Sequence, residues 1–218
     1  MLRGSRANAI ELSALRIFEL RPLLAMVSSL DLSRYPYVSI HAPSRFDAAE
    51  EAGVVDALAA LMPLKWPIVL HPDAIHDFQP WRQFGGMLAI ENMDKRKPIG
   101  RTVRELGSIF DRLPEASFCF DLGHARQIDR TMNEAYCLVR EFGARLRQLH
   151  VSEVNTQSRH DPLSRAAVSA FQKVARWVPE SVPLILETPA AAGEIDTQLS
   201  MANEALSPVQ PSPAAASR

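Results

Sequence analysis

The stretch Ser117–Ala125, which reads S-F-C-F-D-L-G-H-A, decides the fold, because an apolar strand in it leads directly into two potential metal ligands. The residues 118–120 are typical of a strand that is buried on both faces. Asp121 and His124 follow it, and Gly123 between them predicts a sharp turn that directs both side chains into one cavity. A buried Asp at a strand end is more often a helix cap or a salt-bridge partner, so this motif predicts a site only if it is repeated.

Composition limits the classes of protein that the chain can be. With 218 residues, of which 47% are hydrophobic, it can bury the core of one domain. The formal net charge of −1 gives no overall basic field that would indicate nucleic acid. Cys119 and Cys137 fall in an expected strand and an expected helix, which argues against a disulfide framework. No apolar run is long enough for a membrane span, so we expect a cytoplasmic protein that does not contact membranes.

Seven apolar runs, mostly alternating with helical patterns, predict a parallel sheet with helices outside it. The expected strands lie at residues 9–13, 37–43, 67–72, 88–92, 118–120, 146–151 and 182–188. Helices are expected at about 14–29, 48–61, 102–113, 132–143, 166–178 and 194–206, with only a turn or short helix in 73–85 and a long polar loop at 152–163. We expect one domain over residues 1–206, followed by a disordered tail rich in Pro, Ala and Ser over 207–218.

Polar side chains recur where these strands end. The spacings between successive ones are 30, 20, 30, 29 and 37 residues, close to the length of a strand–helix repeat. The carboxyl ends of parallel strands are where active sites of (β/α) barrels are built, so a TIM barrel is the expected fold. An open doubly wound sheet is the alternative, but its site forms at one switch point and needs no such series. The residues in question are His41, His71, Glu91, Asp121, His150 and Glu187.

Seven short motifs in this order resemble those of the endonuclease IV and xylose isomerase-like TIM-barrel superfamily, which includes AP endonuclease family 2. The resemblance covers roughly residues 9–206. The motifs are I-H-A-P at 40–43, L-H-P at 70–72, I-E-N at 90–92, F-D-L-G-H at 120–124, L-H-V at 149–151, S-R-H-D at 158–161 and L-I-L-E-T at 184–188.

The resemblance implies a set of metal ligands. The quartet shared across the superfamily matches Glu91, Asp121, His150 and Glu187. In endonuclease IV the counterpart of Glu91 bridges to a second metal, whose other ligands match His41 and His71. A third metal there matches His124 and His160 together with an Asp two residues before the latter, where this chain has Ser158, so this site is incomplete unless Asp161 substitutes. The candidate catalytic residues are Glu91, Glu187 and His124.

The residue types agree with a metal centre. Imidazole and carboxylate ligands without thiolates suit Zn, Mn or Mg, and we expect Zn. A buried ring of carboxylates at neutral pH is tolerable only when cations neutralise it.

Two departures separate the chain from a DNA-repair enzyme. Endonuclease IV has an aromatic residue three positions after the first ligand His, which enters the DNA stack, and this chain has Ser44 there. Its loops that hold DNA are also longer, so DNA is a disfavoured partner. No strand can be counted before residue 9, so we expect either that the start of the chain is assigned too late or that the barrel is open at this edge. A basic run, Lys95–Lys97, lies in a loop on the catalytic face and is either merely solvated or attracts an anionic substrate.

Three functions follow from these patterns. The first is a di- or trinuclear phosphoester hydrolase, which His41 and His71 favour, acting on a small-molecule or other phosphoester. The second is a one-metal sugar isomerase or epimerase, in which Glu91 or Glu187 moves a proton. The third is a non-catalytic remnant that binds metal or a partner. The substrate, the metal, its number and the oligomeric state are left open by the sequence.

Overall fold

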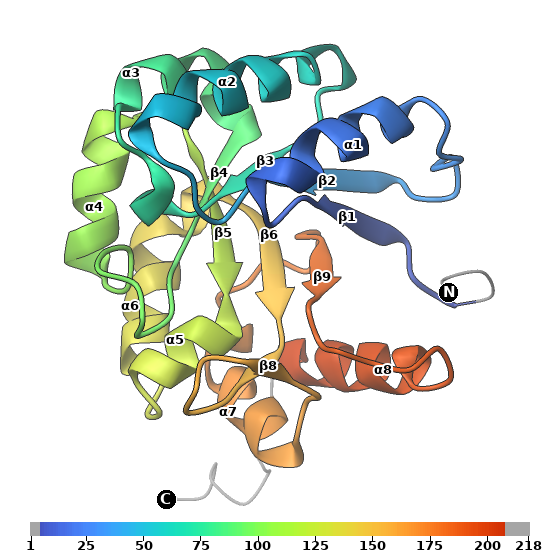
Figure 1. Ribbon diagram of the computed structural model, residues 1–218. Helices are drawn as coiled ribbons and strands as arrows, with labels where there is room; N and C mark the ends of the chain where they lie inside the picture. The colour runs from blue at the N-terminus through green and yellow to red at the C-terminus, as the bar shows by residue number, and fades with distance from the viewer. Residues whose placement is uncertain (1–4, 208–218) are drawn as a thin grey trace, which may run out of the picture.

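The computed structural model describes residues 5–207, so most of the expected tail lies outside the described residues. Seven parallel strands form one sheet that curls into a nearly closed barrel, with helices around the outside (Figure 1). Their order in the sheet is the order along the chain: β1 (Ala9–Ser13), β2 (Tyr37–His41), β3 (Ile68–Leu70), β4 (Leu88–Glu91), β5 (Ser117–Asp121), β6 (Leu146–Val151) and β9 (Leu184–Leu186). The expected seven-stranded TIM barrel is therefore confirmed.

Helices connect these strands, much as the apolar patterns predict. The α-helices are α1 (Ile17–Val27), α2 (Ala48–Ala59), α3 (Phe78–Trp81), α4 (Val103–Arg112), α5 (Leu122–Ile128), α6 (Asn133–Phe142), α7 (Arg165–Ala175) and α8 (Ile195–Leu206). Short 3-10 turns are η1 (Met62–Leu64), η2 (Pro72–Ala74), η3 (Arg82–Met87) and η4 (Gly143–Arg145). Side-chain caps fix several starts: Thr102 accepts from the N–H of Glu105, and Ser164 accepts from that of Ala167.

The prediction of a sharp turn at Gly123 is wrong. Gly123 lies in the first turn of α5, which begins directly after β5, and the described glycines with positive φ are Gly85 and Gly100. The glycine is needed for another reason: a Cβ there would lie 2.6 Å from the Ser152 carbonyl oxygen and 2.7 Å from Val154 Cγ2. Gly123 therefore lets α5 pack against the segment that follows β6.

The expected loop at 152–163 also contains structure. Two-residue strands β7 (Glu153–Val154) and β8 (His160–Asp161) pair antiparallel in it. Strands this short show no apolar alternation, so a sequence pattern cannot reveal them.

Side chains on alternate strand positions point into the barrel. Phe118 and Phe120 point outward and pack with Phe110 and Phe142 under the helices. In the middle of the barrel the inward-facing side chains are small and apolar. Val69, Ala89 and Cys119 form a separate buried cluster there. Above it, towards the carboxyl ends, the inner positions become polar: Glu11, Ser39, His41, Glu91, Asp121, Gln148 and His150. Cys119 and Cys137 are both free, as expected.

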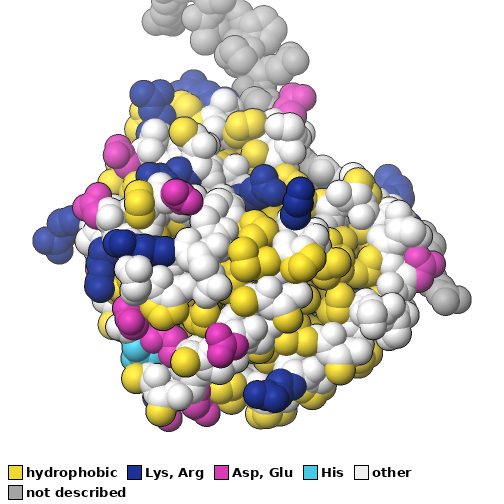
Figure 2. Space-filling model, turned by 90° about the horizontal axis from the view of Figure 1, so that it is seen from above, with side chains coloured by type: hydrophobic (Ala, Val, Ile, Leu, Met, Phe, Trp, Pro, Cys, Tyr) yellow, Lys and Arg dark blue, Asp and Glu magenta, His cyan; other side chains and the backbone are white. Residues whose placement is uncertain are grey.

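The barrel is open between β1 and β9, the two ends of the sheet. Two grooves of about 630 and 820 Å³ run along this opening, with β1 on one side and β9 on the other. No hydrogen-bond ladder joins these two strands within the described residues. Figure 2 shows the face seen from above, where hydrophobic side chains gather among charged ones. None of the described helices has the length and apolar character that a membrane crossing requires.

Candidate metal centre

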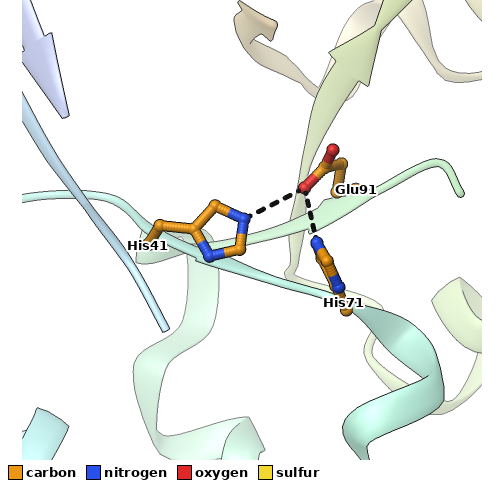
Figure 3. Close-up of side chains that lie close together, drawn as sticks. All are labelled: His41, His71 and Glu91. Carbon is orange, nitrogen blue, oxygen red and sulfur yellow. Dashed lines mark hydrogen bonds and ion pairs between the residues drawn. The ribbon is translucent and has the colours of Figure 1, made fainter. Parts of the chain in front are cut away.

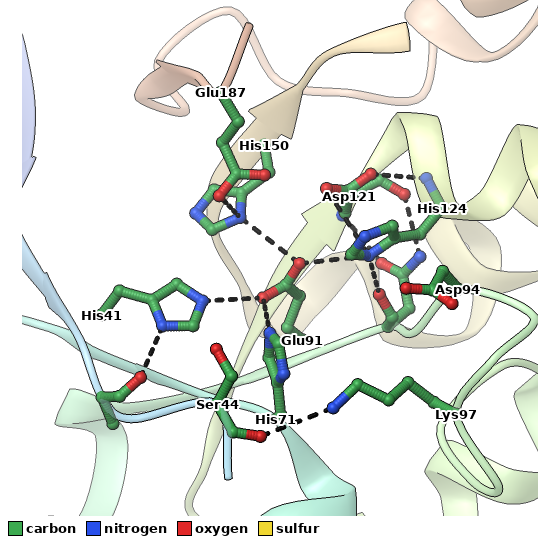
Figure 4. A network of polar contacts seen from close by, with 12 residues as sticks. His41, Ser44, His71, Glu91, Asp94, Lys97, Asp121, His124, His150 and Glu187 are labelled. Atoms are coloured by element: carbon green, nitrogen blue, oxygen red, sulfur yellow. Dashed lines mark hydrogen bonds and ion pairs between the residues drawn. The ribbon is translucent and has the colours of Figure 1, made fainter. Parts of the chain in front are cut away.

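The six polar residues at or just after the strand ends lie together at the carboxyl end of the barrel (Figure 4). Strand register contributes to this, because the pairing of β5 with β6 shifts between Phe118 and Cys119 and then places Asp121 beside His150. Polar side chains that lie far apart in the sequence, from His41 to Glu187, thereby reach one buried cluster.

Glu91 lies at the centre of the cluster, and its two carboxylate oxygens face different partners. Oε2 lies 3.3 Å from His41 Nε2 and 3.2 Å from His71 Nε2. Oε1 lies 3.2 Å from His124 Nδ1 and 3.4 Å from His150 Nδ1. The side chain is 1% exposed. A single buried carboxylate thus connects two sets of possible ligands.

The first set is His41, His71 and Glu91, which Figure 3 shows converging from β2 and from the ends of β3 and β4. One ligand atom from each residue lies within 4.8 Å of the others. His41 Nδ1 is 2.7 Å from the Ala42 carbonyl oxygen, which leaves Nε2 to face Glu91. Burial alone would lower the pKa of His41, but the hydrogen bond to Glu91 raises it to about 9. Burial lowers the pKa of His71.

The second set is Glu91, Asp121, His150 and Glu187, again with ligand atoms within 4.8 Å of one another. Three of its buried atoms have no hydrogen-bond partner: Asp121 Oδ2, His150 Nδ1 and Glu187 Oε2. His71 Nδ1, from the first set, is the fourth such atom among the described residues. Buried polar atoms without partners are costly, and a cation held by the second set would satisfy the three that belong to it. The donor set of carboxylate and imidazole fits Zn, Mn or Mg, so both sets can hold a divalent cation.

The charges of the cluster are balanced only in part. Burial raises the pKa of Asp121 to about 8, and the nearby Glu187 and Glu91 carboxylates add to this. Burial also tends to raise the pKa of Glu187, but His150 lowers it to about 2. The pKa of His124 rises to about 10, because Asp121 and Glu91 outweigh the effect of burial. Without a cation, protons on histidines and on Asp121 offset the carboxylates, so metal binding must release protons.

Comparison with known proteins shows the fold of the chain but not its reaction. No family model and no curated protein sequence matches the chain. A xylose isomerase-like TIM-barrel protein from Mycobacterium smegmatis, solved in complex with magnesium, has a similar structure: TM-score 0.58 and 13% identity over 94% of this chain and 87% of that one. The fold is the xylose isomerase-like TIM barrel. Endonuclease IV from Thermus thermophilus shares it, with a TM-score of 0.55 and 20% identity over 88% of this chain and 83% of that one.

The third ligand set expected for this xylose isomerase-like barrel is not assembled. Within residues 5–207, neither His124 nor His160 belongs to a group with metal-ligand spacing. Their rings meet edge to face at 5.6 Å, and His160 Nδ1 lies 2.8 Å from Ser152 Oγ. Asp161, the possible replacement for the missing carboxylate, belongs to no such group among the described residues either, and its Oδ2 accepts from Asn155 Nδ2 at 2.9 Å. Metal binding by His124 and His160 stays a prediction.

The position of the missing Asp is filled in another way. Ser158 is buried and has a positive φ of 55°. Its hydroxyl is bonded to the side-chain amide of Gln127, at 2.8 Å from Nε2 and 3.1 Å from Oε1. Ser158 therefore holds the loop to α5 and is not directed at the metal centre.

Sequence reasoning missed Glu11. The series of polar residues at strand ends includes none from the first strand, yet Glu11 points into the barrel and lies 3.2 Å from His150 Nε2. Together with His41 and Glu187 it also forms a third group with metal-ligand spacing. The signal in the sequence is a Glu between Ile10 and Leu12, on the side of a barrel strand that alternation directs inward.

Proposed function

We propose that this chain is a two-metal phosphoester hydrolase. The observation that supports it is the position of Glu91, whose Oε2 faces His41 and His71 while Oε1 faces His150. A carboxylate that belongs to two ligand sets at once is suited to bridge two cations. A one-metal enzyme would have no use for His41 and His71 at this place.

The residues divide between two cation positions. His41, His71 and Glu91 would hold one ion, and Glu91, Asp121, His150 and Glu187 the other. Divalent cations in such a pair polarise a phosphoryl oxygen and activate a water for in-line attack. Zn is the ion that we propose, with Mn and Mg as alternatives that the same donors accept.

The protein side chains bind, orient and exchange protons around this pair. At the edge of the cluster, the side chains of Glu187 and the neighbouring His160 are 20% and 32% exposed. Substrate would therefore enter on their side. Glu187 Oε2 has no hydrogen-bond partner, and we assign to this carboxylate the proton of the attacking water. His124, 3.2 Å from Glu91, would hold Glu91 in its bridging position.

We propose a small phosphoester as the substrate, with DNA disfavoured. Ser44 offers no aromatic ring to enter a DNA stack. The basic run contributes little free positive charge, because Arg96 pairs with Asp94 at 2.8 Å and Lys97 with Asp73 at 2.9 Å. A small anionic group could still reach Lys97 by displacing its Asp73 contact.

The test is metal stoichiometry combined with hydrolysis of bis(p-nitrophenyl) phosphate. The purified wild type should bind two ions per chain and hydrolyse the probe only when loaded. His76→Gln serves as a matched control, since His76 lies outside the cluster and bonds the Phe46 carbonyl oxygen. One ion per chain without phosphoester hydrolysis would exclude the two-metal hydrolase.

A one-metal sugar isomerase or epimerase is the second candidate. The observation in its favour is that Glu91, Asp121, His150 and Glu187 make a ligand set of four without any other residue. It predicts one tightly bound ion and exchange of a sugar α-proton with D₂O, measured by NMR over a panel of aldoses and ketoses. Binding of no metal and no turnover of either substrate class would support a non-catalytic remnant.

A further inference from the structure

We propose that Glu11 is a positioning residue: it accepts the Nε2 proton of His150 and thereby keeps Nδ1 of that ring free for a metal ion. The inference rests on the metal centre proposed above, and adds a residue that none of the expected ligand sets includes.

The two nitrogens of His150 have different surroundings. Nε2 lies 3.2 Å from Glu11 Oε1 and 3.3 Å from Oε2, the latter in hydrogen-bond geometry. Nδ1 lies 3.2 Å from Glu187 and 3.4 Å from Glu91, but neither carboxylate has hydrogen-bond geometry to it, and the atom has no partner. The ring is therefore held on its Nε2 side and open on its Nδ1 side.

The neighbours of Glu11 fix its orientation. The Tyr37 hydroxyl donates to Gln148 Oε1 at 2.6 Å, so the amide presents its N–H groups on the other side. Gln148 Nε2 donates to Glu11 Oε2 at 2.8 Å, and the Ser39 hydroxyl donates to the same oxygen at 2.9 Å. These two donors hold Oε2 in place beside His150 Nε2, and Oε1 lies 3.2 Å from the same nitrogen.

A competing arrangement has to be weighed, because Gln148 Nε2 also lies 2.8 Å from His150 Nε2. If Gln148 donated to an unprotonated Nε2, the imidazole proton would move to Nδ1. It would then be buried with no acceptor in hydrogen-bond geometry, and the Glu11 carboxylate would face the Nε2 lone pair. The Glu11 side chain is only 3% exposed, so water would not reduce the cost of the unpaired proton or of the repulsion between the carboxylate and the lone pair. The proton therefore belongs on Nε2.

This arrangement is that of a metal-bound histidine whose other nitrogen donates to a carboxylate, which fixes the ring and raises its basicity. Loss of such a partner weakens metal binding by roughly 10- to 100-fold. Because His150 belongs only to the second ligand set, a positioning role predicts that Glu11→Gln weakens one of the two ions and leaves the one at His41 and His71 unchanged. Glu11 also has metal-ligand spacing to His41, so weakening of the ion at His41 and His71 instead would overturn the positioning role in favour of Glu11 as a ligand.

Two measurements test the proposal. The first is nitrogen-15 NMR of the histidine rings in wild-type protein, metal-free and Zn²⁺-loaded: His150 Nε2 should carry a proton in both states. A proton on Nδ1 with a bare Nε2 in either state would overturn the role of Glu11. This measurement needs no variant, so it decides even if Glu11→Gln fails to fold.

The second measurement is competitive titration of Zn²⁺ against a chelating dye, with Glu11→Gln and the matched control Glu51→Gln. Glu51 is likewise a buried carboxylate with several donors, among them Trp81 Nε1 at 2.9 Å, but it contacts no proposed ligand. We expect about 10-fold or greater weakening of one ion in Glu11→Gln and no change in Glu51→Gln. Equal affinities in Glu11→Gln and wild type would refute the proposal.

These outcomes separate the two proposals. If wild type binds no Zn²⁺, the metal centre fails, and with it the role of Glu11 towards a metal. If wild type binds two ions and Glu11→Gln does the same with unchanged affinity, the metal centre stands and only the positioning role fails.

Discussion

The main-chain N–H of His124 donates to Oδ1 of Asp121 at 2.6 Å, so one oxygen of this carboxylate caps α5 while Oδ2 has no hydrogen-bond partner. A buried Asp at a strand end can serve as a helix cap or as a metal ligand, and here the two roles are compatible. The Asn92 side chain completes the junction by accepting from the Asp121 N–H at 2.8 Å.

Asp121→Asn should separate the two roles. The amide oxygen can keep the cap, but the anionic ligand is lost, so we expect metal affinity at the second set to fall by an order of magnitude or more. In the metal-free protein the same change should be stabilising at high pH. The pKa of Asp121 is raised to about 8 from an ordinary value of 3.8, so the folded state binds this proton more tightly than the unfolded chain does.

The sign of the pH effect follows from that difference. As pH rises from about 4 to about 8, metal-free wild type must lose the contribution of protonated Asp121, and Asn has no such loss. The gain in Tm of Asp121→Asn over wild type should therefore be smallest near pH 4 and largest near pH 8. Each kcal/mol of difference in the free energy of unfolding shifts Tm by about 2–4 °C. Thermal melts in EDTA across this range provide the check. A gain that shrinks with rising pH would contradict the assignment.

The strand ends could be predicted from the sequence because each apolar run stops at a polar residue that a buried strand would otherwise not tolerate. His41, His71 and Glu91 can be predicted as strand-end residues in this way. Glu11 cannot be predicted from this pattern, because one Glu in a short apolar run is also typical of a strand with one solvated face. Only the curvature of the sheet into a barrel places its side chain inside. Metal binding by these residues stays a prediction.

Local packing explains the other differences. Gly123 looked like a turn residue, but its role is to admit the Ser152 carbonyl, a contact between segments that are 29 residues apart in sequence. Helix α5 was missed because it is only seven residues long and begins at the residue after a strand, which leaves no polar linker to mark its start.

Substitutions at the three types of ligand position should remove different ions. His71→Gln should cost the ion of the first set and Glu187→Gln that of the second, whereas Glu91→Gln should cost both, because Glu91 belongs to both sets. Elemental analysis of purified protein measures this directly. His76→Gln should keep both ions. Loss of a single ion in Glu91→Gln would show that this carboxylate does not bridge.

Removal of metal should destabilise the protein. Glu91, Asp121 and Glu187 form a buried cluster of carboxylates that the histidines and protons only partly offset. A metal ion present at a free concentration of 1,000 times its Kd adds about 4 kcal/mol to the free energy of unfolding. For a chain of this size this raises Tm by roughly 8–16 °C. Differential scanning calorimetry with and without EDTA is the measurement, and re-addition of Zn²⁺ should restore the loss. A metal-free protein that melts at the same or a higher temperature would argue against ligation by this cluster.

Gly123→Ala should destabilise the barrel. The added methyl would meet the Ser152 carbonyl oxygen at 2.6 Å and Val154 Cγ2 at 2.7 Å, so α5 or the start of the β7–β8 hairpin must move. Overpacking of this kind costs about 1–3 kcal/mol, which lowers Tm by roughly 2–12 °C. Gly107→Ala in α4 is the matched control: no atom lies within 4 Å of its Cβ, and the helix should gain about 0.5–1 kcal/mol. If both variants melt alike, the close approach at Gly123 does not exist in solution.

The open edge of the barrel should be visible in amide hydrogen exchange. The Ala14 N–H donates to the His41 carbonyl oxygen, so by alternation the amide of Leu12 faces β2 while that of Glu11 faces the groove beside β9. On the other side the Glu187 N–H bonds the Val151 carbonyl oxygen, which leaves the Leu186 amide facing the same groove.

We expect the Glu11 and Leu186 amides to exchange roughly 100-fold or more faster than that of Leu12, since an amide without a backbone partner needs no opening of the sheet to exchange. Ile90, in a strand flanked on both sides, supplies the protected reference. Equal protection of Glu11 and Ile90 would mean that something bridges the two edges in solution. Exchange measured at two protein concentrations then identifies it: protection that rises with concentration points to a strand from a second copy, and protection that does not change points to a segment of the same chain.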